Sequence, residues 1–318
     1  MNPSTPSCRH AFSAALLEAA RVDRNIFVVC SDSKGSAALG DFEAALQAQF
    51  VEAGIAEQDA VGIAAGLARC GKRVFVSGPA SFYSARSLDQ VKVDVAYAGS
   101  NVKVVGISGG VSYGALGSTH HSLHDIAVMR CFPGLEVFIP CDFASTRAVT
   151  AYLASSDGPA YMRLGRAAVA DVYDPAAAIK FQPGKAMLVR EGADCSILAV
   201  GETVQPALAA AELLAARGIQ ARVLDFCSIV PLDMEAIATA ARETGSIVTV
   251  EEHSIHGGLG AAVAEVVVQK APVPMRILGF PDEWPPAGSP AQLFEHYGLT
   301  ADGIAKAALD LFRTSRAR

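Results

Sequence analysis

The sequence predicts an α/β protein with two doubly wound domains, each built around a mainly parallel sheet. Short apolar runs alternate with helical patterns along most of the 318 residues. The runs are of the buried type, which is typical of parallel strands covered by helices on both faces. The length also suits two domains, since a single core stops growing before about 300 residues.

The first half of the chain begins this alternation. The predicted strands are NIFVVCSD, RVFVSG, VKVVGIS, LEVFIP and PAYMRLG, and the predicted helices are Glu57–Cys70, Ser84–Tyr97 and one that runs through Tyr152. The pattern then lapses in AAVADVYDPAAAIKFQPG, which has two prolines and no clear period. This segment predicts a linker.

The alternation resumes after the linker. The strands predicted there are CSILAVG, IQARVLDF, SIVTVEE and VPMRILGF, and the helices are Val204–Arg217, Asp233–Glu243, Gly258–Gln269 and Ile304–Phe312. We therefore predict domains at 1–166 and 185–318, joined by a linker at 167–184.

Composition narrows the classes of function. With 51% hydrophobic and 18% charged residues, the chain is expected to bury a large core. A net charge of -6 without a Lys/Arg cluster argues against a nucleic-acid partner. No apolar stretch reaches the ~18 residues of a membrane span. The seven cysteines form no Cys-x-x-Cys pair and indicate reduced thiols, so we expect a soluble cytoplasmic protein.

An acidic residue opens a helix of small residues in GIAEQDAVGIAAG. Glu57 in a first helical turn has a simple explanation, because the helix dipole favours an acid there by up to ~1 kcal/mol. The small residues around it also leave room for a ligand or a second backbone. A carboxyl group in such surroundings can serve as a hydrogen-bond donor, so Glu57 is a candidate catalytic residue.

Aromatic and basic residues follow the next strand in SGPASFYSARSLDQ. Phe82 or Tyr83 could stack on a planar ligand while Arg86 faces an anion or a substrate oxygen. The alternative is an aromatic core with a solvated arginine. Farther along, Arg163 and Arg166 follow a strand and suit a phosphate or carboxylate, although surface salt bridges explain them as well.

A glycine-rich loop, SGGVSYGALGSTHHSLHD, carries three histidines. His120 is predicted to be catalytic or to face the substrate, with His121 and His124 in capping or supporting roles. No cysteine or third ligand accompanies them, so we expect no metal site in this chain. His253 and His256 lie in a glycine turn, and close packing of the following helix on its sheet explains this segment without a catalytic role.

Taken together, these motifs resemble the thiamine-diphosphate enzymes of the transketolase family, in the order of the C-terminal half of transketolase. The resemblance covers about Ala11 to Phe312. GIAEQDAVGIAAGLA is similar to the segment whose glutamate activates the cofactor. SFYSARSLDQ matches the ring that stacks on the aminopyrimidine, and STHHSLHD matches the loop with the substrate histidine.

The resemblance implies a role for each candidate. Glu57 would hydrogen-bond the cofactor's pyrimidine, Tyr83 with Phe82 close by would stack on it, and Arg86 would line the same site. His120 would bind substrate hydroxyls and Arg163 a substrate phosphate. The implied reaction moves a two-carbon ketol unit from a ketose phosphate to an aldose or keto acceptor.

The family's Gly-Asp-Gly motif, which holds the diphosphate through Mg²⁺, does not occur in this sequence. The resemblance therefore implies a companion N-terminal subunit that carries the diphosphate and the metal, with thiamine diphosphate shared between subunits. The expected assembly is an α2β2 heterotetramer.

Two departures from the family bear on the substrate. Leu116 stands where transketolase has an aspartate that reads a hydroxyl of the acceptor, and Ser108 stands where it has a histidine that contacts phosphate. An unusual sugar phosphate such as apulose 4-phosphate would fit Leu116. The alternatives are the beta subunit of a 2-oxo-acid dehydrogenase, an enzyme like deoxyxylulose-phosphate synthase, and a non-catalytic subunit that kept the fold.

Overall fold

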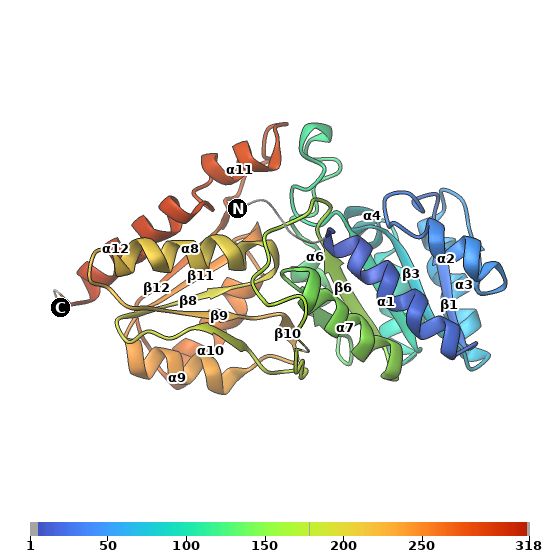
Figure 1. Ribbon diagram of the computed structural model, residues 1–318, viewed down its shortest axis with the longest axis horizontal. Helices are drawn as coiled ribbons and strands as arrows, with labels where there is room; N and C mark the ends of the chain where they lie inside the picture. The colour runs from blue at the N-terminus through green and yellow to red at the C-terminus, as the bar shows by residue number, and fades with distance from the viewer. Residues whose placement is uncertain (1–5, 178, 317–318) are drawn as a thin grey trace.

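The computed structural model describes residues 6–177 and 179–316 and contains two sheets flanked by helices (Figure 1). The predicted α/β class is therefore confirmed. The limits predicted for the domains and the linker, 1–166, 167–184 and 185–318, stay a prediction. Their residues 1–5, 178 and 317–318 lie outside the described part.

The first sheet has the order β10-β5-β6-β4-β3-β1-β2. Its strands are β1 (Ile26–Cys30), β2 (Phe50–Glu52), β3 (Arg73–Pro79), β4 (Val102–Ile107), β5 (Glu136–Phe138), β6 (Ala160–Leu164) and β10 (Ser228–Val230). Its helices are α1 (Cys8–Val22), α2 (Gly40–Ala45), α3 (Glu57–Arg69), α4 (Ala80–Ala85), α5 (Leu88–Gln90), α6 (Asp125–Met129) and α7 (Phe143–Ser155), with short turns η1 (Gln47–Gln49), η2 (Val91–Tyr97) and η3 (Gly114–Leu116).

Both faces of this sheet are covered, which explains its continuous apolar strands. In β3, Val74 and Val76 pack into the cluster that contains residues of α3, whereas Phe75 packs into the cluster that contains residues of α1 and α7. Because side chains alternate along a strand, each strand needs apolar residues at every position to fill both layers.

The second sheet has the order β12-β11-β8-β9-β7. Its strands are β7 (Met187–Arg190), β8 (Cys195–Ala199), β9 (Ala221–Asp225), β11 (Ile247–Ser254) and β12 (Met275–Phe280). Its helices are α8 (Val204–Ala215), preceded by η4 (Gly201–Thr203), α9 (Met234–Thr244), α10 (Leu259–Lys270), α11 (Pro290–His296) and α12 (Ala301–Arg316). Figure 1 shows α8 and α12 on one face and α9 and α10 on the other.

Two features differ from the sequence-based prediction. The helix expected at Ser84–Tyr97 is broken: α4 already begins at Ala80, directly after Pro79, and η2 is a π-helical turn. In addition, β10 belongs to the second half of the chain but pairs antiparallel with β5 of the first sheet, with Ser228 opposite Phe138. The two halves of the chain are thus joined by strand pairing as well as by the chain itself.

No helix in residues 6–177 and 179–316 is long and apolar enough to cross a membrane. The seven cysteines are free thiols.

Candidate functional site

Glu57 and Arg86 meet at the start of α3. Glu57 is the first residue of this helix, and its side chain is only 3% exposed. The Nη1 of Arg86 donates to its Oε2 at 2.6 Å. Arg86 itself is 47% exposed, so the pair joins a buried carboxylate to a solvent-facing cation. The structure therefore brings together two residues that the sequence singled out separately.

The two neighbouring rings of α4 point to different places. Tyr83 is fully buried in the core, where its hydroxyl donates to Ser31 Oγ at 3.0 Å. Phe82 is only half-buried, and the guanidinium of Arg86 lies 4.5 Å from its ring centroid. The expected stacking role of Tyr83 does not fit this position, because its ring has no free face. Phe82 is the ring of this pair that a ligand could reach.

A row of rings and cations continues from Phe82. The ring of His120 lies 5.4 Å from Phe82 and 5.6 Å from Tyr113, edge-on to both. The guanidinium of Arg166 lies 5.2 Å from the Tyr113 ring. We call Arg86, Phe82, His120, Tyr113 and Arg166 the aromatic row. It links the carboxylate of Glu57 to a second cationic region contributed by the segment after β6.

That cationic region contains an arginine that the sequence analysis missed. Arg9 of α1 donates from Nη1 to the carbonyls of Gly35 and Ser36 at 3.3 and 3.1 Å. Burial lowers the pKa of Arg9, and the charge of Arg166 lowers it further. In the described part of the chain, neither arginine pairs with a carboxylate within 4.0 Å. Two neighbouring cations without an acid are typical of an anion site.

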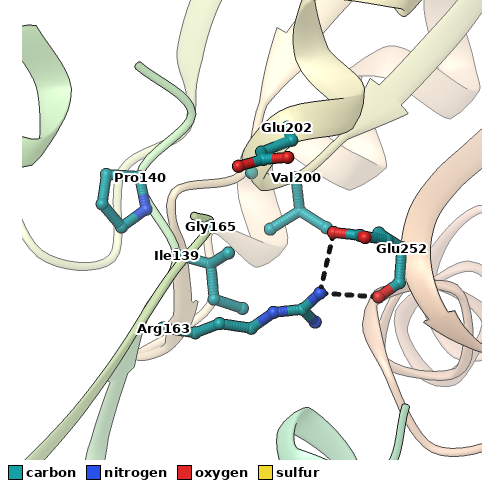
Figure 2. A pocket seen from close by; sticks show the side chains of 8 residues that line it. Ile139, Pro140, Arg163, Gly165, Val200, Glu202 and Glu252 are labelled. Carbon is teal, nitrogen blue, oxygen red and sulfur yellow. Dashed lines mark hydrogen bonds and ion pairs between the residues drawn. The ribbon is translucent and has the colours of Figure 1, made fainter. Parts of the chain in front are cut away.

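Arg163 lies elsewhere, inside the junction between the two sheets. Its Nη2 donates to the backbone oxygen of Glu252 at 2.7 Å and to the Oε2 of the same residue at 3.1 Å, as Figure 2 shows. Nη1 is 3.6 Å from Asp125 Oδ1. The adjoining cavity of about 10 Å³ has room for one water at most. A phosphate does not fit beside Arg163, so the expected phosphate contact is not supported at this position.

The two positions at which the sequence departs from the pattern that it resembles both lie on the segment after β4. Ser108 is fully buried, adopts a left-handed φ of 59°, and its hydroxyl has no hydrogen-bond partner among the described residues. Leu116 ends η3 and is 54% exposed, on the same loop as His120. Leu116 is therefore accessible to a ligand, whereas Ser108 is not.

The remaining histidines are mainly structural. The Nε2 of His121 lies 3.1 Å from the Gly114 oxygen, and burial lowers the pKa of this imidazole. His124 precedes α6 without a side-chain cap, and its ring lies 5.9 Å from that of Trp284. His253 is buried, which lowers its pKa to about 4, and its Nε2 accepts from Ala127 N at 3.3 Å. His256 is exposed.

No group of three or more His, Cys, Asp or Glu residues within 6–177 and 179–316 could hold a metal ion.

Two family models match the chain. The transketolase pyrimidine-binding domain matches residues 4–171, and the transketolase C-terminal domain matches residues 184–304.

Individual relatives match over nearly the full length. The chain is 56% identical over 307 residues to a subunit of the apulose-4-phosphate transketolase of Phocaeicola vulgatus, covering 96% of this chain and 98% of the relative. It is 40% identical over 305 residues to the 6-deoxy-6-sulfo-D-fructose transketolase subunit SqwH of a Clostridium species, covering 94% and 92%. A solved structure, a split-gene transketolase described as an inactive beta4 tetramer, superposes with a TM-score of 0.91 at 38% identity, covering 98% of this chain and all of that one.

Proposed function

Because this chain belongs to the transketolase family, whose members depend on thiamine diphosphate, we propose that it is the C-terminal subunit of a split transketolase. It would transfer a two-carbon ketol unit from a ketose phosphate to an aldose or keto acceptor. The observation that carries this proposal is the aromatic row, which extends from the buried Glu57 to Arg166 and the neighbouring Arg9, two cations that pair with no carboxylate in the described residues.

The residues present fit the pyrimidine end of the cofactor. Glu57 offers a carboxylate oxygen at the start of a helix, and the half-buried ring of Phe82 offers a stacking surface next to it. Arg86 holds the carboxylate in place. When bound, thiamine diphosphate supplies the nucleophilic carbon that carries the two-carbon unit between sugars.

The diphosphate end does not fit this chain alone. The sequence contains no Gly-Asp-Gly segment, and no metal-binding cluster occurs in the described residues. We therefore assign the diphosphate and Mg²⁺ to a companion subunit and place the cofactor between the chains of an α2β2 assembly. The relatives support this, since two are named as subunits and the solved neighbour as a split-gene protein.

The substrate would lie along the rest of the row. His120 presents an imidazole whose Nδ1 is 3.0 Å from Thr119 Oγ1, a contact that orients the ring. Its other nitrogen can then hydrogen-bond sugar hydroxyls. Arg166 and Arg9, rather than Arg163, would hold the phosphate group, because they lie at the end of the aromatic row and neither pairs with a carboxylate among the described residues.

The donor sugar can be tested directly. Leu116 is exposed on the loop that carries His120, and its side chain cannot accept a hydrogen bond. A relative at 56% identity is named for apulose 4-phosphate. We expect the chain, reconstituted with its companion subunit, to prefer apulose 4-phosphate over xylulose 5-phosphate. The third donor to be tested is 6-deoxy-6-sulfo-D-fructose, for which another relative is named. Equal turnover of the first two sugars would contradict the substrate assignment. No ketol transfer from any of them would contradict the proposed function itself.

The phosphate assignment makes a separate prediction. Arg166→Ala should raise the KM for a phosphorylated sugar by about 10- to 100-fold, because a charge-assisted hydrogen bond contributes about 1.5–3 kcal/mol. The KM for the same sugar without its phosphate should barely change. Arg217→Ala, which removes an exposed arginine after α8, is the control. An equal rise in KM for both sugars would show that Arg166 does not read the phosphate.

A further inference from the structure

The loop that carries His120 is held by the second domain. We call residues 108–124 the His120 loop. Near its start, Val111 N donates to Glu252 Oε1 at 2.8 Å. In its middle, Ser118 Oγ donates to the Pro285 oxygen at 2.8 Å. At its end, Ser254 N donates to the Leu123 oxygen at 3.0 Å. The loop leaves the first sheet, but these contacts are made to β11 and to the segment after β12.

The fit at the start of the loop is close. Glu252 is 5% exposed, and its two oxygens accept from different parts of the first domain, Oε1 from Val111 N and Oε2 from Arg163 Nη2. A Cβ added at Gly110, where φ is +60°, would lie 2.1 Å from the Glu252 carboxyl carbon. Only glycine suits this position, because the carboxylate sits directly against the loop backbone. Figure 2 shows Glu252 reaching across the junction towards Arg163.

The middle of the loop is fitted in the same way. At Gly114, where φ is +44°, an added Cβ would lie 2.7 Å from the Gly288 oxygen. The Trp284 ring also packs edge-on against His124. The segment 284–288 therefore follows the course of the loop instead of touching it at one point.

We propose that the second domain sets the conformation of the His120 loop, with Glu252 as a positioning residue that fixes its first turn. Glu252 acts through the backbone of Gly110 and Val111, and so determines where His120 stands relative to Phe82 and Tyr113. The inference rests on the proposed function only in taking His120 as the substrate-facing group. The contact between the domains can be measured without any turnover.

The test uses a chemical difference between a carboxylate and an amide. In Glu252→Gln only one oxygen remains as an acceptor, so either Val111 N or Arg163 must face an NH₂ group. Glu251 provides a matched control in the same strand. It is buried, and its two oxygens accept from Leu259 N at 2.7 Å and Gly260 N at 2.8 Å, at the start of α10. Glu251→Gln loses the same charge and the same kind of bond without touching the loop.

Hydrogen exchange of the full chain reports on the loop directly. In Glu252→Gln, amides of residues 109–123 should exchange about tenfold faster or more than in wild type, while Glu251→Gln should leave them unchanged. In the reconstituted enzyme, Glu252→Gln should raise the KM for the sugar more than it lowers kcat. Unchanged exchange in Glu252→Gln, or equal acceleration in both variants, would overturn the proposal, as would faster exchange with an unaltered KM.

A milder pair of variants tests the middle of the loop if Glu252→Gln folds poorly. Ser118→Ala removes the bond to Pro285, whereas Ser118→Thr keeps a hydroxyl in its place. We expect faster exchange and a higher KM in the alanine variant, with recovery of both in the threonine variant. Equal behaviour of alanine and threonine would contradict the proposal. If the enzyme transfers no ketol unit at all, the exchange data still decide whether the second domain holds the loop.

Discussion

Glu57→Gln is expected to lower ketol transfer by the reconstituted pair about 10²- to 10⁴-fold, the range that a positioned acid–base group contributes. The Glu57 side chain is 3% exposed and begins the first turn of α3, so bulk water does not readily take its place. Glutamine preserves the shape but cannot exchange a proton with the pyrimidine ring. The quantities to measure are kcat and the Kd for thiamine diphosphate in the assembled enzyme.

The control for this experiment lies on the same helix. Asp59→Asn removes an exposed acid from the same first turn of α3, and so changes the charge near the helix start without altering the buried site. Its activity should stay within about twofold of wild type, as expected for surface substitutions. Undiminished transfer by Glu57→Gln, or an equal loss in both variants, would remove Glu57 from the catalytic assignment.

Arg163→Ala should lower the free energy of unfolding by about 3–5 kcal/mol, because it leaves buried carboxylates without their cation. The side chains of Arg163, Glu252 and Asp125 are 5%, 6% and 0% exposed, so water cannot replace the lost partner. Denaturant unfolding of the isolated chain measures the effect. Arg147→Ala, which breaks an exposed pair with Glu18, should cost about 1 kcal/mol or less.

The loss in Arg163→Ala should also depend on pH. Burial raises the pKa of Glu252, and Arg163 opposes that rise. When the pKa of a carboxyl is raised in the folded state, the protein becomes less stable as the pH increases above the pKa of the same group in the unfolded chain, about 4.3. The reason is that the unfolded chain then binds fewer protons than the folded one. Without Arg163 this loss extends to higher pH. The deficit should thus be larger near pH 8 than near pH 5, and a constant deficit would contradict the role of Arg163 as the partner of Glu252.

Local patterns were sufficient to place one end of the site. Glu57 begins α3 as its sequence indicated, and the strands on either side fix it at the carboxyl edge of the sheet. The end of β6 also carries information that the sequence analysis did not use. Arg163 lies inside β6, where all five positions are buried, whereas Arg166 lies beyond the end of the strand. The strand boundary could therefore have separated the buried arginine from the accessible one.

Other parts of the site depend on contacts that no local pattern encodes. The choice between Phe82 and Tyr83 follows from the start of α4 at Ala80, which turns Tyr83 into the core. Arg9 belongs to α1, a helix that was not predicted. It lies near Arg166 only because the chain folds so that α1 comes close to the segment after β6. Glu252 contacts Val111 across 141 residues of sequence. Such pairs are set by how the two domains dock, and periodicity within either domain does not report on docking.

The position of β10 at the edge of the first sheet has a consequence for association with other chains. A long, unpaired outer strand is a template for aggregation, and proteins protect such edges. In the described part of the chain, β10 pairs with β5 and forms one edge of the sheet, and β2 pairs with β1 and forms the other edge. Both outer strands are only three residues long. Because β10 of the second domain forms this short edge, the larger sheet exposes few unpaired backbone N–H and C=O groups with which a strand of a neighbouring molecule could pair.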